Sequence, residues 1–257
     1  MLENLKTEKR NLDSMNLDEL SIFEIIDLMN KEDLNVIATV KKELHAIKKV
    51  IEQCVQSIKN GGRIIYVGAG TSGRIGILDA IECPPTFGIE PNVVIGILAG
   101  GNDSMFAKEE AEDSYELGQK NMKELKILKE DIVIGLAASG RTPFVIGALD
   151  YANNVQATTA CITCNKNTEI AKHVSYPIEI DNGPEILIGS TRLKAGTSQK
   201  MVCNMISTAT MIQLGKVYEN LMVDVDVSNE KLYQRWLSIV KTATNCSEET
   251  AIKFYEK

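Results

Sequence analysis

The sequence predicts an α/β fold in which a doubly wound, five-stranded parallel sheet is flanked by helices, with helical extensions at both ends of the chain. Three observations support this prediction. Short apolar runs recur along the middle of the chain, patterns of helical period lie between them, and turns rich in glycine and hydroxyl side chains follow two of the runs. Because strands and helices alternate, the pattern indicates βαβ units with parallel strands.

Residues 1–60 are expected to form a helical segment that packs on the sheet domain. A short helix is predicted near residues 21–26. One long amphipathic helix is predicted from 30 to 59, because apolar residues such as Leu34 and Ile37 recur there at helical spacing. Two glycines then end the helix.

The sheet domain is predicted to span residues 61–217. Its strands are short apolar runs without alternation, as expected for parallel strands that helices cover on both faces. They are expected at residues 63–67, 93–98, 132–136, 158–163 and 176–180. Helices are expected at 74–80, 104–128, 143–154 and 194–215. Residues 218–257 are more polar and are expected to form a short helical C-terminal segment, with a helix that starts near Cys246.

Composition and charge exclude several classes of protein. With 28 basic and 35 acidic residues the net charge is -7, which argues against binding to a nucleic acid backbone. No stretch has the apolar core of a signal peptide or the length of a membrane span. The six cysteines lie mostly in apolar runs, as reduced thiols do. We therefore expect a cytoplasmic protein that binds neither nucleic acid nor membrane.

Two turns have the composition of a phosphate site. The first strand is followed by GAGTSGR at 68–74 and the third by AASGRTP at 137–143. Ligands of open α/β sheets bind beyond the carboxyl ends of the strands, where helix N-termini offer N–H groups to an anion. An alternative is that Thr71 and Ser72 only cap the helix. Because the two turns would meet at one crevice, we expect them to surround one phosphate monoester.

A dinucleotide is disfavoured although the first turn matches the GxGxxG fingerprint, because residues 99–102 lack the acid that would hold a ribose. A third loop, 189–197, adds Ser190 and two cations, Arg192 and Lys194, at the start of the last long helix. The candidate substrate-binding residues are Gly70, Thr71, Ser72, Ser139, Gly140, Arg141, Thr142 and Ser190.

Two glutamates are the candidate acid and base. Glu82 precedes Pro84 and Pro85, and since proline cannot continue a helix, we expect the helix to stop there and to fix the backbone of Glu82. Glu112 belongs to an acidic run on a predicted helix, and spacing does not distinguish it from its neighbours. Solvated helix acids are the alternative for both. Two carboxyls that flank a sugar can take a proton from carbon and give one to a leaving oxygen.

Cys161 and Cys164 have the CxxC spacing of some metal and redox sites. No second pair and no suitably spaced histidines accompany them, so we expect no metal site.

Several segments together resemble the N-acetylmuramic acid 6-phosphate etherase family. These segments are LKTEKRN at 5–11, GAGTSGR at 68–74, DAIECPPTFG at 79–88, AASGRTP at 137–143, GSTRLKAGTSQK at 189–200 and GKVYENLMVDV at 215–225. The resemblance extends from about residue 5 to about residue 250.

The resemblance implies a sugar isomerase (SIS) domain with flavodoxin-like strand order, an active site near a homodimer interface, and no metal or organic cofactor. It implies a lyase that cleaves the D-lactyl ether of a phosphorylated amino sugar, N-acetylmuramic acid 6-phosphate, by elimination and then hydration. The products are N-acetylglucosamine 6-phosphate and D-lactate, and the role is in peptidoglycan recycling. By resemblance, Glu82 is the proton donor and Glu112 the second active-site glutamate. Family members usually extend further, so the segment 218–257 is expected to be shorter than theirs.

Three rival functions are a non-catalytic phosphosugar sensor, a phosphosugar isomerase and a nucleotide-dependent dehydrogenase. The presence of both Glu82 and Glu112 favours the etherase over the sensor. The ECPPT segment argues against the isomerase, and the missing acid after the second strand argues against the dehydrogenase.

Overall fold

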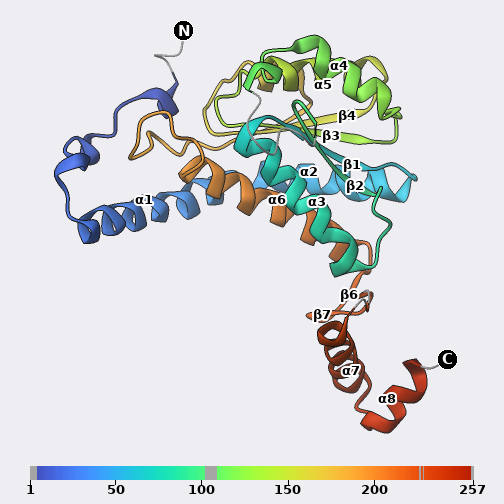
Figure 1. The fold of residues 1–257 in the computed structure, drawn as a ribbon. Coiled ribbons are helices and arrows are strands. Elements are labelled where there is room, and N and C mark those ends of the chain that lie inside the picture. The colour runs from blue at the N-terminus through green and yellow to red at the C-terminus, as the bar shows by residue number, and fades with distance from the viewer. Residues whose placement is uncertain (1–4, 102–108, 226, 228, 256–257) are drawn as a thin grey trace.

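The computed structural model describes residues 5–101, 109–225, 227 and 229–255, and a parallel sheet of five strands lies at its centre (Figure 1). The strands are β1 (Ile64–Gly68), β2 (Val94–Leu98), β3 (Ile132–Ala137), β4 (Thr158–Thr163) and β5 (Tyr176–Glu179). Their order is β2-β1-β3-β4-β5, which confirms the predicted doubly wound sheet. Because β1 pairs with β3, with Gly68 opposite Leu136, the turns that follow these strands are neighbours.

Helices cover both faces of the sheet, as predicted (Figure 1). One face is covered by α2 (Leu44–Lys59), α3 (Gly70–Phe87), α6 (Lys194–Gln213) and the end of α1 (Ile22–Lys42). The other face is covered by α4 (Tyr115–Glu124) and α5 (Pro143–Asn154). Alternate residues of each strand face opposite sides. Tyr66 therefore packs against the first layer and Val67 against the second, which divides the apolar core into two clusters.

The predicted single helix from 30 to 59 is wrong, because two helices, α1 and α2, meet at Glu43. Ser21 caps α1 in a capping box with Glu24, so the short helix predicted near 21–26 is the first part of α1. The break lets α1 extend beyond the sheet (Figure 1). As a result Leu34 and Ile37 are 64% and 60% exposed. Ahead of α1 lie three 3-10 helices, η2 (Lys6–Glu8), η3 (Leu12–Ser14) and η4 (Leu17–Glu19).

Helix α3 does not stop at Glu82, contrary to the prediction from Pro84 and Pro85. Both prolines lie in the last turn, and the helix ends only at Phe87. There Gly88 adopts the left-handed conformation (φ 59°, ψ 38°) and its N–H donates to the Pro84 carbonyl at 2.9 Å. Two prolines in a final turn remove hydrogen bonds without requiring a forbidden φ, so the glycine ends the helix instead.

The C-terminal residues form an arm that extends away from the sheet (Figure 1). This C-terminal arm, residues 217–255, consists of a short antiparallel hairpin of β6 (Val217–Tyr218) and β7 (Leu221–Met222), followed by α7 (Glu230–Thr244) and α8 (Glu248–Tyr255). Helix α8 lies where a C-terminal helix was predicted. The hairpin was not predicted. Helix α7 lies within the segment 218–257 that was expected to be helical, although its bounds were not predicted.

The cysteines form no disulfide, and all six are free thiols. Cys161 packs in the cluster under α5, whereas Cys164 packs against Ala138 and Ala195, so the two CxxC side chains do not share an environment. Burial raises the pKa of each to about 12. Among the described helices, none is long and apolar enough to cross a membrane.

The fully buried carboxylate of Asp131, just before β3, binds Arg63, just before β1. It accepts hydrogen bonds from the Arg63 N–H at 2.9 Å, from Arg63 Nη2 at 2.6 Å and from the Leu128 N–H at 2.9 Å. The Arg63 side chain is 20% exposed and that of Asp131 is 0% exposed.

We expect Asp131→Ala to lower the free energy of unfolding by about 3 kcal/mol, because it leaves a partly buried guanidinium and two N–H groups without their acceptor. Urea denaturation measures the change. Glu124→Gln, which removes an exposed ion pair with Lys120, serves as the control and should cost less than about 0.5 kcal/mol. Equal effects of the two substitutions would contradict this account.

Candidate active site

The three predicted loops meet at the carboxyl edge of the sheet. The turn after β1 and the turn after β3 are adjacent because their strands pair in register. The third loop reaches the first at the start of α6, where a Cβ on Gly196 would lie 3.6 Å from Thr71 Cγ2. Residues from all three loops therefore lie in the same region at this edge of the sheet, which we call the crevice.

The first turn presents the start of α3 without a side-chain cap. Ala69 is the N-cap residue, so Thr71 and Ser72 lie inside the helix and the capping alternative is wrong. Gly70 is exposed, and Thr71 is half-buried. The first N–H groups of a helix carry partial positive charge and bind anions. This turn can therefore receive a phosphoryl group.

Ser72 has a second role that its sequence context did not indicate. Its hydroxyl donates to Gln199 Oε1 at 2.8 Å, and both side chains are buried between α3 and α6. The hydroxyl thus joins the two helices whose first turns border the crevice.

The second turn and Glu112 form one pocket of about 280 Å³, the Glu112 pocket, which Asp113, Ser139, Arg141, Thr142 and Pro143 also line. The Thr142 hydroxyl donates to Glu112 Oε1 at 3.0 Å, and the Phe144 N–H donates to the Glu112 carbonyl at 3.0 Å. The carboxylate is therefore held beside the start of α5, which also lacks a side-chain cap.

Glu112 does not lie on a helix, contrary to the prediction. It occupies the turn between the 3-10 helix η6 (Glu109–Ala111) and α4. The helix predicted for 104–128 is confined to α4 within the described residues, and the predicted part at 104–108 lies outside them.

Gly140 shapes the second turn because no other residue fits there. Its φ is +71°, and a Cβ would lie 2.4 Å from Thr168 Cβ. Thr168 precedes the 3-10 helix η7 (Ile170–His173), so this contact fixes the turn against the segment that follows β4.

The third loop contributes less to the crevice than its sequence suggested. Lys194 is buried and forms an ion pair with Glu32 of α1, so it is not offered to a ligand. Glu185 accepts hydrogen bonds from the N–H groups of Lys194 and Ala195 at 3.1 and 2.9 Å, and its carboxylate occupies the N-terminus of α6. Burial raises the pKa of Glu185, and these hydrogen bonds oppose the rise. Helix α5 begins with Pro143, which has no N–H, and the Phe144 N–H already donates to the Glu112 carbonyl. A phosphoryl group is thus left with the start of α3 and the hydroxyls of the second turn.

Asn165 is a buried residue near the second turn that the sequence analysis missed. Its Oδ1 accepts from the N–H groups of Lys6 and Thr7 at 2.8 and 3.3 Å. Its Nδ2 donates to Thr7 Oγ1 at 3.0 Å and to the Ala138 carbonyl at 3.1 Å. One buried amide thus fixes the N-terminal segment to the residue before Ser139. No motif spacing connects residues so distant in the chain, and no local signal identifies Asn165.

Glu82 lies in a different place from Glu112. It is exposed on α3 and lines a separate pocket of about 340 Å³ between α3 and α6, the Glu82 pocket, together with Asp79 and Lys200. Burial raises the pKa of Asp79, whose carboxylate accepts from the Ser207 hydroxyl at 3.0 Å. An α-helix rises about 1.5 Å per residue, which places Glu82 roughly 18 Å along α3 from Gly70. Within one chain, Glu82 and Glu112 therefore line different pockets.

Models of known protein families match most of the chain. Residues 46–153 match the glucokinase regulatory protein N-terminal SIS domain, residues 110–209 match the SIS domain, and residues 219–255 match the C-terminal lid domain of glucokinase regulatory protein.

Among curated relatives, N-acetylmuramic acid 6-phosphate etherase 2 of Enterococcus faecalis is 56% identical over 99% of this chain and 87% of its own length. N-acetylmuramic acid 6-phosphate etherase of Bacillus cereus strain 03BB102 is 56% identical over 100% of this chain and 88% of its own length.

Solved structures share the fold at low identity. A putative phosphosugar isomerase from Bacteroides fragilis superposes with a TM-score of 0.58 at 18% identity, covering 77% of this chain and 94% of its own. A phosphoheptose isomerase from Neisseria gonorrhoeae has a TM-score of 0.57 at 16% identity, covering 74% and 98%. The Vibrio vulnificus NanR protein complexed with ManNAc-6P has a TM-score of 0.55 at 11% identity, covering 86% and 70%.

We expect Asn165→Ala to loosen residues 5–11 from the sheet domain, because buried backbone groups lose their partners at about 1–3 kcal/mol each. Trypsin should then cleave after Lys6, Lys9 or Arg10 at least about tenfold faster. Asn153→Ala, which removes hydrogen bonds to His173 and Thr159 elsewhere, is the matched control. Similar cleavage rates in the two variants would count against the role of Asn165.

Proposed function

The chain belongs to the N-acetylmuramic acid 6-phosphate etherase family, and we propose that it cleaves the D-lactyl ether of N-acetylmuramic acid 6-phosphate with Glu82 and Glu112 as its acid and base groups. The products are N-acetylglucosamine 6-phosphate and D-lactate. The observation that carries the site assignment is the hydrogen bond from Thr142 to Glu112, which holds an acid-base group beside a turn suited to phosphate.

The phosphoryl group is bound by the first turn of α3 and by the hydroxyls of the turn that precedes α5. The N–H groups at the start of α3 lack a side-chain cap, whereas at the start of α5 Pro143 has no N–H and the Phe144 N–H donates to the Glu112 carbonyl. Thr71, Ser139 and Thr142 supply hydroxyls. Such a site binds a compact dianion through local dipoles, which is consistent with a chain whose net charge is -7. Anchoring the phosphoryl group orients the sugar toward Glu112.

The reaction is an elimination followed by a hydration. Opening of the sugar ring gives an aldehyde, which acidifies the proton on C2. We propose that Glu112 takes this proton while Glu82 gives a proton to the ether oxygen at C3. The C3–O bond then breaks, D-lactate leaves and a C2=C3 double bond forms. Addition of water restores a hydrogen at C2 and places a hydroxyl at C3. Each positioned group contributes about 10²- to 10⁴-fold in rate.

These steps are proton transfers to and from groups activated by a carbonyl, so we propose that the enzyme needs neither a metal nor an organic cofactor. We also propose that the protein is a cytoplasmic homodimer with its active site near the subunit interface. It acts in peptidoglycan amino-sugar recycling. We further propose three units, residues 1–60, 61–217 and 218–257, of which the second binds the phosphosugar.

Isomerase and sensor functions are the alternatives. The solved isomerases and the NanR complex are at most 18% identical to this chain, and that likeness shows the fold alone. An isomerase would also remove a C2 proton but would release no lactate, and a sensor would do neither. Assays for lactate therefore separate the three functions.

We expect Glu82→Gln to release lactate about 10²- to 10⁴-fold more slowly but still to exchange the C2 proton of the substrate in D₂O, because the base remains and only the acid is lost. Glu112→Gln should lose both activities. Coupled lactate detection and NMR of the C2 position measure the two steps. Glu116→Gln, at an exposed position on α4, is the control. Unchanged lactate release by Glu82→Gln would refute its role.

We expect Ser139→Ala to raise KM for the phosphosugar by about 10- to 100-fold, since one hydrogen bond to a charged group is worth about 1.5–3 kcal/mol. Inhibition by inorganic phosphate should weaken in parallel. Initial-rate kinetics provide both values. Ser175→Ala, an exposed position outside the crevice, should change neither, and a wild-type KM in Ser139→Ala would exclude Ser139 from the phosphate site.

A further inference from the structure

The proposed substrate carries two anionic groups, the phosphoryl group on C6 and the carboxylate of the lactyl group on C3. The crevice accounts for the first of them. We propose that the Glu82 pocket binds the second, with Lys200 of α6 as its cation, so that this pocket recognises the D-lactyl group. The inference rests on the proposed function, which supplies the lactyl substrate, and it adds the residue that recognises this substituent.

The place of the carboxylate follows from the proposed chemistry. A single carbon separates the ether oxygen from the lactyl carboxylate, so the acid that protonates this oxygen lies beside the carboxylate as well. Because Glu82 is the proposed acid, the carboxylate must bind in or next to the pocket that Glu82 lines. This holds whichever chain of a homodimer binds the phosphoryl group. A carboxylate that leaves water for such a pocket needs a cation and hydrogen-bond donors.

Lys200 is the one cation among the described residues that line the Glu82 pocket. It is exposed, and it enters no ion pair within the described part of the chain. By contrast, Lys194, which lies earlier on the same helix, is buried in an ion pair with Glu32. An ammonium group without an ion-pair partner is available to the carboxylate of a ligand.

A series of hydrogen bonds holds the Lys200 ammonium at the pocket. The Asn204 amide, in the orientation that satisfies both neighbours, accepts from Lys200 Nζ at 2.8 Å and donates to Asp79 Oδ1 at 3.1 Å. The same Asp79 oxygen accepts from the Ser207 hydroxyl at 3.0 Å. Burial raises the pKa of Asp79, and the charge of Lys200 opposes this rise. Since an ammonium has three donors and Asn204 takes one, two remain for a ligand.

The other residues of the pocket suit the rest of the lactyl group. Ile75, Phe87 and Cys203 form an apolar wall that can contact the methyl group. The ether oxygen at Glu82, the carboxylate at Lys200 and the methyl group at this wall are three different contacts around one carbon. Three such contacts distinguish the D from the L configuration, so the arrangement also accounts for a preference for the D-lactyl group.

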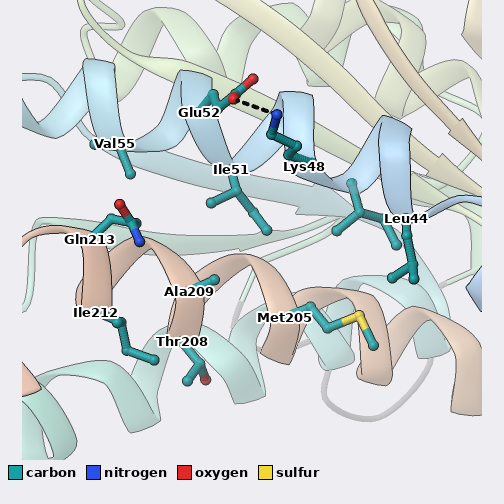
Figure 2. A pocket seen from close by; sticks show the side chains of 11 residues that line it. Leu44, Lys48, Ile51, Glu52, Val55, Met205, Thr208, Ala209, Ile212 and Gln213 are labelled. Atoms are coloured by element: carbon teal, nitrogen blue, oxygen red, sulfur yellow. Dashed lines mark ion pairs between the residues drawn. The ribbon is translucent and has the colours of Figure 1, made fainter. Parts of the chain in front are cut away.

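A neighbouring groove between α2 and α6, the α2–α6 groove, shares Thr208 with the Glu82 pocket but does not suit an anion (Figure 2). Its volume is about 730 Å³. The lysine that lines it, Lys48, forms an ion pair with Glu52 at 3.4 Å on α2 (Figure 2). Most other lining residues are apolar, namely Leu44, Ile51, Val55, Met205, Ala209 and Ile212. The Glu82 pocket is therefore the better match for a carboxylate.

Substrates with and without the carboxylate charge test the proposal. Lactate release from N-acetylmuramic acid 6-phosphate is compared with lactamide release from the analogue in which an amide replaces the lactyl carboxylate. In the wild-type protein the amide should lower kcat/KM by about 10- to 100-fold, the range expected for a hydrogen bond to a charged group. Lys200→Met should lower kcat/KM for the acid by a similar factor. In this variant the acid and the amide should react within about twofold of each other.

Two controls separate recognition of the lactyl group from a general loss of structure. Lys123→Met removes an exposed lysine from α4, on the other face of the sheet, and should keep the wild-type preference for the acid. Inhibition by N-acetylglucosamine 6-phosphate, which has no lactyl group, should be unchanged in Lys200→Met. Lys200→Arg, which keeps the charge, should recover part of the preference.

A binding measurement gives the same comparison without turnover. Isothermal titration calorimetry of the acid and of the amide is carried out on Glu82→Gln, with and without Lys200→Met. The acid should bind more tightly than the amide only where Lys200 is present. This measurement decides the question even if Lys200→Met turns over too slowly to be assayed.

The inference would be overturned by a full preference for the acid in Lys200→Met, which would leave the proposed function standing. It would also be overturned if Arg141→Gln, at the Glu112 pocket, abolished the preference while Lys200→Met did not, because the carboxylate would then bind at that pocket. Equal rates for the acid and the amide in the wild-type protein would show that the charge is not recognised. Release of neither lactate nor lactamide by the wild-type protein would overturn the proposed function, and this inference with it.

Discussion

The parallel pairing of β1 with β3 is the constraint on which the rest of the site depends. It places Gly68 opposite Leu136, so that two turns distant in the chain start two helices side by side. Neither α3 nor α5 has a side-chain cap at its N-terminus, whereas the carboxylate of Glu185 fills that of α6. Because α5 begins with Pro143 and its Phe144 N–H donates to the Glu112 carbonyl, the start of α3 is the one of these three that is left to a phosphoryl group.

Buried polar contacts hold this edge in one geometry. Asn165 joins the N-terminal segment to the second turn, Ser72 joins α3 to α6, and Thr142 orients Glu112. Buried polar groups are stabilising only when their partners are present. The cost of leaving any of them unpaired keeps the crevice in a single arrangement, which is what positioning a sugar between acid-base groups requires.

Parts of the surface of the chain are apolar. Apolar residues are exposed along α1, α3 and the α2–α6 groove, although the sheet itself has a complete core on both faces. The proposed acid lies on that surface, far along a helix from the phosphate turns.

The sequence by itself determined the sheet and its flanking helices, because short apolar runs, helical periodicity and glycine placement are local signals. It did not determine that α1 breaks at Glu43, that α3 continues through Pro84 and Pro85, or that Lys194 is buried against Glu32. Tertiary structure decided these points, and it also separated Glu82 from Glu112. Motifs record which residue types are present, whereas the distance between two of them depends on how rigid helices pack in three dimensions.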